Sequence, residues 1–505
     1  MKVAIVGGGV GGLSSLWLLN EFSEHQVHIY EKDHWWGGHA HTVKFQQPGK
    51  ETCEIDTAFI AINSRNYPNF YRFIQESAVE MIKTTMSFSL SRDGGLFEWA
   101  SNNLWSLFCQ SSNFFKPRIY RMMWDIFRFH IFAKDLLTEK GESEGLSIGQ
   151  YLDKEGYSQS FKEDYLLPLT AGIWSIPPEK VALDFPAMAL VRFFHNHQML
   201  QLWGKPAWLT VKGGSAKYVE KIINKVPKDR LHLQTGIEKI MPLEDGGVVV
   251  KEEAGREVRY DKVIIATHTD QAVQLLGEHI THEEKSVLGG CEWSANEAWV
   301  HYDEALMPTR KRAWTAWNYL TSTKAVTPSH ESKTTASDVS TISITFDLNV
   351  LQSLPVHRHG HIFVTLNPPV QPDVSKTLSR WIYHHPILTP ALIHAQKGLP
   401  SIQGKRGLYF VGAWTGYGFH EDGWRAGMEI VYRPEFGLQN KPWSIARVDT
   451  RDIKRETGEW ALRPVVGGLD MVAKRLFNWL NWPMSLYLSL IRVFFWPSSW
   501  KPLIV

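Results

Sequence analysis

The sequence predicts an α/β fold, α+β overall, in which a nucleotide-binding domain is assembled from separated parts of the chain. Three observations support this prediction. The opening stretch "VAIVGGGVGGLSSLWLL" has the pattern of a buried strand, a glycine-rich turn and a helix. A block of alternating short strands covers residues 231–276. Late in the chain, the stretch "GAWTGYGFHEDGW" follows a short apolar run, where a strand is expected to lead into a helix.

The first motif is the glycine-rich turn between two predicted strands. Val3–Val6 is typical of a strand buried in a parallel sheet, and a helical pattern covers Leu13–Phe22. The turn between them fits G-x-G-x-x-G, and a second strand, Val27–Tyr30, ends at Glu31. Such glycines let a pyrophosphate approach the helix N-terminus, and the acid accepts ribose hydroxyl groups. The predicted dinucleotide-binding residues are Gly7, Gly8, Gly9, Gly11, Gly12, Glu31 and Lys32.

This motif alone leaves NAD and FAD open. Six residues past Glu31 comes a second glycine pair, and then the stretch "EIDTAFIAIN" at 54–63. This continuation resembles the flavin-binding N-terminus of the FAD-dependent amine oxidase and phytoene desaturase superfamily. The resemblance implies FAD as cofactor and a glutathione-reductase-type Rossmann domain. It departs from the superfamily at His39, usually arginine, and at Ala58, usually glycine. The implied flavin contacts here are Gly37, Gly38, His39, Thr57 and Ala58.

The late glycine-rich stretch resembles the closing segment of the same flavin domain. Residues 408–411 are expected to form the last strand, and a helix to begin near Gly423 with its N-terminus aimed at the pyrimidine end of the flavin. The resemblance implies that Glu421 or Asp422 accepts hydrogen bonds from the ribityl hydroxyls, and that the backbone around Ile237 lies at the adenine. The further implied flavin contacts are Ile237, Gly412, Glu421, Asp422 and Gly423.

Aromatic and histidine side chains of the same stretch are expected to face the isoalloxazine and the substrate. His420 is predicted to be catalytic because the ordinary pKa of histidine allows proton transfer near neutrality. The alternative is a histidine that only hydrogen-bonds the cofactor or the backbone. Tyr417 is the second predicted catalytic residue, and Trp414 and Phe419 are the predicted substrate contacts.

Further segments narrow the resemblance. Four stretches resemble a branch of predicted NAD/FAD-binding amine oxidase-like proteins: "TAGIWSIPPEKVALDFPAMALVRFFHNH" (170–197), "WLTVKGGSAKYV" (208–219), "VTLNPP" (364–369) and "HHPILTPALIHAQ" (384–396). That branch is associated with fatty-acid modification. The resemblance covers roughly residues 1–435, so it implies a fold for most of the chain and a lipid substrate by association only.

The expected domain organisation follows from the order of these segments. The FAD-binding domain is expected to be discontinuous, with residues 1–65, 205–280 and 400–435. Residues 66–204 and 281–399 are expected to form an inserted substrate domain of helices and β-sheet. The C-terminal extension, residues 436–505, contains amphipathic patterns such as "LDMVAKRLFNWLNW". These helices are expected either to rest on a membrane or to pack on the body, and they are too short to cross a bilayer.

Composition and charge exclude several other classes. With 505 residues, 44% of them hydrophobic, the chain can bury a large core. A formal net charge of +2 without a basic run argues against nucleic acid as a partner. The three cysteines, Cys53, Cys109 and Cys291, form no C-x-x-C pair, so we expect no metal site and no disulfide framework. The apolar run begins directly after Lys2, so we expect an intracellular protein, cytoplasmic or peripheral on a membrane, and not a secreted one.

The sequence thus predicts an FAD-dependent oxidoreductase that acts on an apolar, fatty-acyl or other lipid substrate. Hydride is expected to pass from the substrate to flavin N5, which gives a desaturated or oxidised product. Three alternatives stay open: a redox-neutral double-bond isomerase, an amine oxidase, and a non-catalytic flavin-binding scaffold for a membrane or partner. Amine oxidation is disfavoured because the acids of the late stretch come further from the strand than in ordinary amine oxidases. The electron acceptor and the oligomeric state are open.

Overall fold

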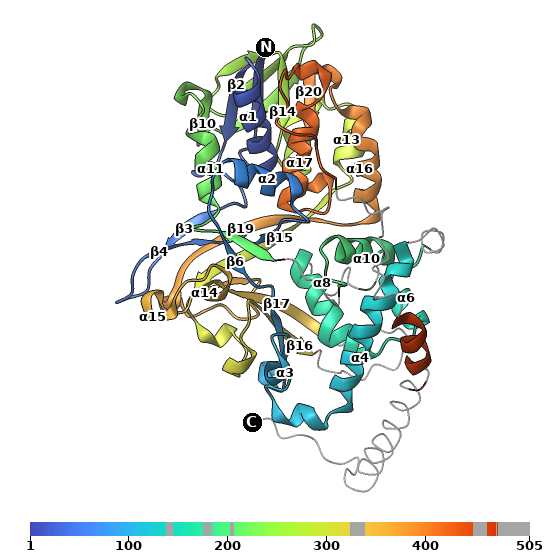
Figure 1. Ribbon diagram of the computed structural model, residues 1–505. Coiled ribbons are helices and arrows are strands. Elements are labelled where there is room, and N and C mark those ends of the chain that lie inside the picture. Colours follow the sequence, from blue (N-terminus) through green and yellow to red (C-terminus); the bar gives the residue numbers. More distant parts are fainter. Residues whose placement is uncertain are drawn as a thin grey trace, which may run out of the picture.

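The structure is a computed structural model. It describes residues 1–137, 145–174, 183, 185–201, 207–323, 339–447, 462–470 and 472. The described chain has two halves, one of which carries the N-terminus at the top of Figure 1. The other half, at the bottom of the figure, carries a second sheet and the helices that are coloured cyan.

A five-stranded parallel sheet forms the centre of the upper half. Its strand order is β10 (Leu231–Leu233), β2 (Gln26–Glu31), β1 (Lys2–Val6), β14 (Lys262–Ile265) and β20 (Leu408–Phe410). In the central strand, Val3, Ala4 and Ile5 are fully buried, as the apolar run predicts for a strand covered on both faces. The strands expected at 3–6, 27–30 and 408–411 therefore form, each within one residue of the expected bounds.

Two helices follow β1 and β20 and pack against each other. They are α1 (Val10–Phe22) and α17 (His420–Val431), and α1 also packs on α11 (Ala216–Ile223). The sequence placed the start of the last helix near Gly423, three residues too late. The carboxylate of Asp422 accepts hydrogen bonds from the backbone N–H groups of Tyr417 and Phe419, at 3.0 and 3.1 Å. Because these bonds fold the loop beneath the first turn, the helix begins at His420.

A three-stranded antiparallel sheet leads from β10 back into the parallel sheet. It comprises β11 (Ile237–Pro242), β12 (Val248–Glu252) and β13 (Glu257–Tyr260). Helix α12 (Thr269–Leu276) packs on β11, and α13 (His282–Leu288) packs between α12 and α16 (Pro390–Ile402). This arrangement extends the upper half beyond the parallel sheet.

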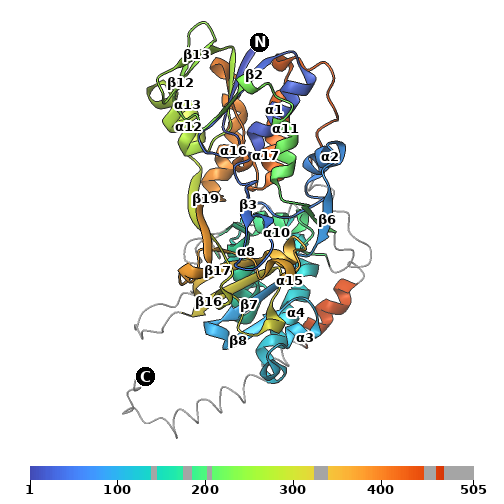
Figure 2. The same ribbon diagram turned by 90° about the vertical axis from the view of Figure 1, so that its left-hand side faces the viewer.

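The lower half contains a seven-stranded sheet. Its order is β19 (Thr377–Ile387), β15 (Glu292–His301), β18 (Phe363–Leu366), β17 (Val339–Asp347), β16 (Trp317–Thr323), β7 (Phe88–Arg92) and β8 (Phe97–Ala100). The long strands β15 and β19 pair from Glu292 with Ile387 to His301 with Thr377. Figure 2 shows β19 running from this sheet toward the upper half. The boundaries expected for the two domains stay predictions.

Helices pack beside the seven-stranded sheet (Figure 1). They are α4 (Pro117–Phe132), α6 (Ile148–Lys154), α7 (Gln159–Phe161), α8 (Leu167–Trp174) and α10 (Ala187–Asn196). A π-helical turn, η4 (Lys162–Leu166), joins α7 to α8. The buried carboxylate of Asp164 in η4 pairs with Arg92 of β7 at 2.6 Å and with Arg118 of α4 at 2.7 Å. Because breaking a buried ion pair is costly, these contacts fix the helices against the sheet.

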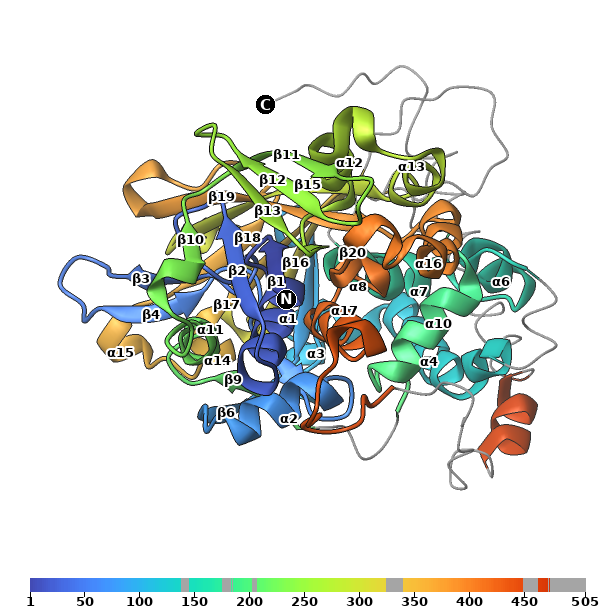
Figure 3. The same cartoon turned by 90° about the horizontal axis from the view of Figure 1, so that it is seen from above.

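Smaller elements complete the described chain. The hairpin β3 (Thr42–Phe45) and β4 (Cys53–Asp56) projects to one side in Figure 3. A short sheet joins β5 (Ile62–Asn63), β9 (Trp208–Val211) and β6 (Met81–Thr84). The other short helices are α2 (Pro68–Glu76), α3 (Leu104–Leu107), α14 (Leu348–Leu351) and α15 (Val356–His359).

A helix at residues 462–470 packs on α4. The Asp470 carboxylate lies 2.7 Å from Nε of Arg128 and accepts from Nε1 of Trp124 at 3.1 Å, while Val466 is buried. The C-terminal extension therefore begins against the body of the protein. The amphipathic face expected beyond residue 472 lies outside the described residues. No helix within the described ranges is long and apolar enough to cross a membrane.

Candidate functional site

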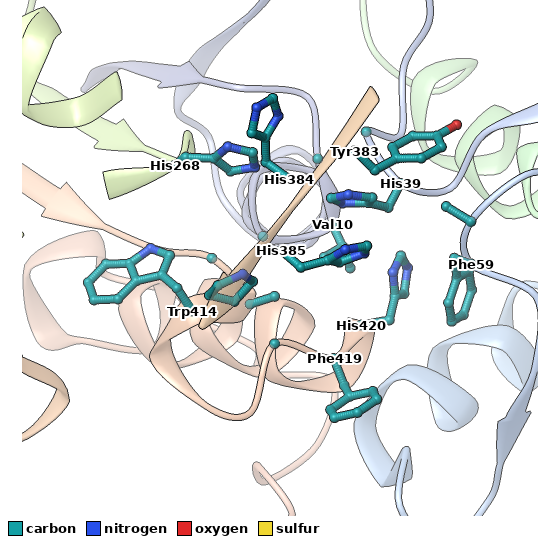
Figure 4. Close-up of a pocket in the computed structure, with 18 of the residues that line it drawn as sticks. Val10, His39, Phe59, His268, Tyr383, His384, His385, Trp414, Phe419 and His420 are labelled. Atoms are coloured by element: carbon teal, nitrogen blue, oxygen red, sulfur yellow. The ribbon is translucent and has the colours of Figure 1, made fainter. Parts of the chain in front are cut away.

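A cavity of about 1050 Å³ lies at the carboxyl edge of the parallel sheet. Four neighbouring strands of that sheet end at its wall, and the residues at these ends are Gly7, Glu31, Ala266 and Gly412. In open α/β sheets this edge is where ligands bind, because loops and helix N-termini converge there. Figure 4 shows the side chains around the centre of the cavity.

The glycine-rich turn has the shape of a phosphate cradle. Gly7 has φ +110°, and a Cβ there would stand 2.8 Å from the Ala266 carbonyl oxygen, so only glycine fits the turn. A Cβ at Gly12 would lie 2.1 Å from the Gly7 oxygen, which makes Gly12 a packing residue outside the cavity wall. A Cβ at Gly9 would meet no atom within 4 Å. Gly9 therefore opens toward the cavity at the start of α1, as a diphosphate requires.

Glu31 lies where a ribose-binding acid is expected. One carboxylate oxygen accepts from the N–H of Gly8 at 2.8 Å, and the other accepts from the N–H of Asp33 at 3.0 Å. Burial raises the pKa of Glu31. Each oxygen has a further lone pair for a hydroxyl donor. Gly8 is outside the cavity wall, so its part is to orient this carboxylate, while Lys32 lines the cavity beside it.

The second glycine pair and the start of β11 extend the same wall. Gly37 and Gly38 line the cavity, and Cβ of an alanine at Gly38 would lie 3.2 Å from Cα of Gly9. The two glycine-rich turns therefore touch. Ile237 lines the cavity at the start of β11, which is the end where the resemblance implies the adenine. Ala58 also lines the cavity, next to Phe59.

Two helix N-termini face the cavity together. Val10 of α1 and His420 of α17 both line it. The helices approach closely because Oγ of Ser14 donates to the Trp424 carbonyl at 2.7 Å and because a Cβ at Gly427 would lie 2.0 Å from that Oγ. Both helix dipoles therefore point their positive ends at one ligand. That arrangement suits a diphosphate at α1 and the negative charge of a reduced flavin at α17.

Histidine rings surround the middle of the cavity (Figure 4). The His39 and His385 rings stack with centroids 5.2 Å apart. Burial lowers the pKa of His39 to about 4, and burial lowers the pKa values of His268 and His385 to about 3. These imidazoles are therefore neutral near pH 7. The described residues contain no cluster of three or more side chains that could hold a metal ion.

His39 supplies a direct test of whether a cofactor fits. Its Nε2 is buried and has no hydrogen-bond partner. A buried polar atom without a partner is costly, and a ligand hydrogen bond removes that cost. Together with the open position at Gly9, this atom fits an FAD that runs from the glycine-rich turn to the histidines. His39, Glu31 and the two helix N-termini would hold the cofactor.

His420 lies at the far end of this histidine group. Its Nε2 is 2.7 Å from the hydroxyl of Tyr218, and its ring stacks on Phe59 with centroids 3.7 Å apart. Burial lowers the pKa of His420 well below its ordinary value. This lowered pKa favours the alternative of a histidine that only forms hydrogen bonds, and the catalytic role of His420 stays a prediction. Burial also raises the pKa of Tyr218 well above its usual value, so the phenol keeps its proton and can donate it to Nε2.

The two adjacent acids of the late stretch do not face the cavity. The Glu421 carboxylate accepts from Nδ2 of Asn69 at 2.6 Å and from the N–H of Phe70 at 3.0 Å. Asp422 caps the loop before α17, as described above, and neither acid lines the cavity. The interpretation that one of them binds the ribityl hydroxyls is therefore corrected. Their donors come from α2 and from the loop itself, which the sequence pattern did not connect.

Several other expected contacts also lie outside the cavity wall. The hydroxyl of Thr57 donates to the His41 carbonyl at 3.1 Å. Tyr417 packs against Phe193 with ring centroids 6.0 Å apart. A Cβ at Gly423 would lie 2.6 Å from Cγ1 of Val10, so Gly423 permits the contact between α17 and α1. None of these three expected residues lines the cavity, whereas Trp414, Phe419 and Gly412 do.

The part of the cavity in the lower half is apolar. Sequence reasoning missed its lining, because the residues are scattered over many elements and share no motif. They come from β7, η4, α8, α10, β16, β17 and β18 and include Phe88, Tyr165, Leu169, Phe193, Trp317, Phe346 and Leu366. His384 and His385 of β19 were also missed as cavity residues, since β19 reaches the cavity only through its pairing with β15.

Known proteins share both sequence features and the fold. A model of the family described as flavin containing amine oxidoreductase matches residues 10–327. A CLA-producing fatty acid isomerase from P. acnes is 12% identical with a TM-score of 0.55, and the match covers 85% of this chain and 97% of that one. Cyclohexylamine oxidase from Brevibacterium oxydans is 13% identical with a TM-score of 0.56 and the same two coverages. A redesigned putrescine oxidase is 12% identical with a TM-score of 0.57, covering 86% and 99%.

These structural matches establish the amine oxidase-type, FAD-binding fold. No curated protein sequence matches the chain significantly. The family match spans more than half of the chain, and it agrees with the sequence resemblance and with FAD as the cofactor. The chain belongs to the family of flavin-containing amine oxidoreductases and is an FAD-dependent oxidoreductase.

Proposed function

We propose that this enzyme oxidises an apolar substrate, a fatty-acyl chain or another lipid. Bound FAD would accept a hydride from one C–H bond while the adjacent carbon loses a proton to solvent, which leaves a C=C bond. The distribution of charge around the cavity carries the proposal. Among the described lining residues the acids are Glu31, Asp33, Glu238 and Glu253. Glu31 ends β2, Asp33 follows it, Glu238 lies in β11, and Glu253 directly follows β12. All four lie at the nucleotide end. A cationic amine in the apolar part would be buried without a carboxylate, which is costly.

The apolar part suits a long hydrocarbon. Aromatic and aliphatic side chains line it, with polar groups contributed by His130, His197 and Gln198. Ligand cavities of this kind bind through buried apolar area and use a few polar groups to fix orientation. Burial also lowers the pKa of His197 to about 4, so this side chain is neutral near pH 7. An uncharged acyl chain therefore meets no buried charge there.

Bound FAD supplies the hydride acceptor. The chain contributes position and the exclusion of water. Phe59 holds the His420 ring by stacking, and Tyr218 holds its Nε2 by a hydrogen bond. A neutral imidazole that accepts at Nε2 carries its proton on Nδ1. We propose that His420 acts as a fixed hydrogen-bonding group of the active site.

A redox-neutral isomerase, which moves a double bond, is the second candidate. The fold-level likeness to a fatty acid isomerase supports it. The names of the structurally similar putrescine and cyclohexylamine oxidases keep amine oxidation as a third candidate. The absence of acids from the described apolar lining argues against it.

An anaerobic visible spectrum of the purified holoprotein tests these candidates. Long-chain fatty acids are added in one series, and putrescine and cyclohexylamine in a control series. We expect the oxidised flavin band near about 450 nm to bleach with a fatty acid and to persist with the amines. A persisting band with a displaced double bond in the fatty acid identifies the isomerase. Bleaching by amines alone, or no change in any series, contradicts the proposal.

We also propose that the C-terminal extension contacts a membrane peripherally. In its described part, Val465, Leu469 and Val472 are exposed at spacings of four and three residues, which places them on one helix face. That stripe faces away from the buried Val466. Replacing Val465 and Leu469 by serine should weaken vesicle binding. Unchanged binding of this variant contradicts a membrane role for the extension.

A further inference from the structure

An exposed apolar surface lies around α3, and none of its side chains lines the cavity. We call it the α3 surface and define it by the side chains of Leu96, Leu104, Trp105, Phe114 and Phe115. Trp105 is 81% exposed and Phe115 is 86% exposed. Large side chains that are exposed singly are ordinary, but a group of this size on neighbouring elements marks an interaction site.

These side chains belong to one connected piece of structure. The stacked rings of Phe108 and Phe114, with centroids 3.9 Å apart, hold the turn η2 (Ser111–Phe115) against the end of α3. The side-chain amide of Gln110 donates to the Leu96 carbonyl at 3.0 Å, which ties the preceding loop to the same place. The apolar side chains are therefore presented together by internal hydrogen bonds and ring packing.

Cationic side chains border the α3 surface. Residues 99–124 contain Lys116, Arg118 and Arg121 and no acidic residue. Arg118 pairs with Glu163 and Asp164, and Arg121 pairs with Asp125, so Lys116 is the cation of this segment that lies outside these ion pairs. The turn η8 (Lys311–Ala313) packs against α3 and adds exposed Lys311 and Arg312, the first of which also pairs with Glu304. Glu98, just before this segment, is fully buried and paired with Arg310. Exposed aromatics bordered by cations match the two components of an anionic lipid surface.

The position of the α3 surface in the fold also suits contact with a planar partner such as a bilayer. Figures 1 and 2, which differ by a quarter turn, both show α3 at the lower extremity of the molecule, opposite the N-terminal half. At such an extremity, the other elements of the described ranges lie behind the α3 surface, so they leave it open to a planar partner.

We propose that the α3 surface is a docking site for a lipid bilayer that contains anionic lipid. Trp105 and Phe115 enter the boundary between headgroups and acyl chains, and the neighbouring lysine and arginine side chains pair with phosphate and carboxylate headgroups. This inference depends neither on the proposed substrate nor on the C-terminal extension.

Flotation of the full-length holoprotein with vesicles tests the proposal. The vesicles contain phosphatidylcholine alone or phosphatidylcholine with added phosphatidylserine. We expect binding to the mixed vesicles, and we expect the W105S/F115S variant to bind them at least about tenfold more weakly, because two large aromatic side chains are removed from the contact. Added salt should weaken wild-type binding. Both substituted positions are exposed, so unfolding is a small concern, and a thermal melt of the variant checks it.

A matched control uses equally exposed apolar residues elsewhere. Val370 is 69% exposed, and Val374 of the turn η9 (Val374–Lys376) is 86% exposed. The V370S/V374S variant should bind vesicles as the wild type does. Equal binding by W105S/F115S and wild type overturns the proposal. A wild type that floats with neither kind of vesicle also overturns it. So does a W105S/F115S variant that loses self-association in light scattering and keeps its vesicle binding, because the surface would then be a contact between copies of the chain. If a soluble acyl substrate bleaches the flavin in both variants, the loss of vesicle binding is independent of the enzyme activity.

Discussion

The hydroxyl of Tyr218 lies 2.7 Å from Nε2 of His420, and the imidazole ring is stacked on Phe59. Tyr218 belongs to α11 and His420 begins α17. The bond therefore joins two residues that are 202 positions apart in the sequence. It fixes a neutral imidazole at the cavity wall, because burial disfavours the charged form of both partners.

The first prediction concerns this pair. Tyr218→Phe keeps the ring and removes the donor, so we expect turnover to fall about tenfold, the size of one lost hydrogen bond. His420→Ala should lower turnover further while FAD stays bound. Tyr417→Phe is the matched control, since Tyr417 lies outside the cavity wall and should leave the rate unchanged. Steady-state kinetics and the flavin spectrum of each variant are the measurements. A Tyr417→Phe variant as slow as Tyr218→Phe would restore Tyr417 as a catalytic candidate.

The second prediction concerns the phosphate cradle. Gly9→Val fills a position that no protein atom occupies, so the protein should fold and FAD should bind at least about tenfold more weakly, since the new branches take the place of a phosphate. Gly468→Val is the control, because its Cβ also meets no atom within 4 Å, on the helix at 462–470. Fluorescence titration of the apoprotein with FAD measures the difference. Equal FAD affinity in the two variants would contradict the placement of the diphosphate.

The third prediction is a loss of stability in acid. His385 has a pKa of about 3 in the folded protein and 6.5 as its reference value. The unfolded chain therefore binds a proton first as the pH falls, and folding free energy is lost below about pH 6.5. Between about pH 7 and pH 5 one such histidine costs about 2 kcal/mol.

His385→Gln should remove that part of the pH dependence. Urea unfolding at both pH values, with FAD held constant, measures the free energies. The same slope in the wild type and the His385 variant would show that this histidine is not buried in the neutral form.

The fourth prediction separates the two interpretations of Glu421. Glu421→Ala removes the acceptor of the backbone N–H groups of Asn69 and Phe70 and one of the two acceptors of the Asn69 side-chain amide, which should cost about 2 to 4 kcal/mol of unfolding free energy. FAD affinity should stay unchanged, since the carboxylate faces away from the cavity. Glu429→Ala, on the same helix at a partly exposed site, should change little. A large loss of FAD affinity at equal stability would support the ribityl interpretation instead.

Local patterns predicted much of the architecture. The strand, glycine turn and helix at the N-terminus are contiguous, so their spacing carries the motif, and the fold class and the FAD cofactor are both confirmed. The direction of side chains in the late stretch could not be predicted in the same way. The Glu421 side chain points toward α2 because the hydrogen-bond donors of Asn69 and Phe70 lie there. The neutral state of His420 follows from burial, and that burial depends on partners brought from α11 and from the loop after β4.

The histidines of β19 show the same limit. His385 reaches His39 only because β19 pairs with β15 along its length and so extends into the upper half. The register of two strands that are separated by some eighty residues is set by the whole sheet. No short sequence pattern in either strand predicts the contact between His385 and His39.

The parallel sheet joins the first residues of the chain to β20, and the cavity wall includes both Gly9 and His420. During synthesis the N-terminal segments leave the ribosome long before α17 does. The glycine-rich turn therefore lacks its partner helix α17 until the chain has been synthesised beyond His420. FAD binding is consequently a late event in the synthesis of this protein. A message truncated before α17 yields a polypeptide that lacks one wall of the cofactor-binding cavity.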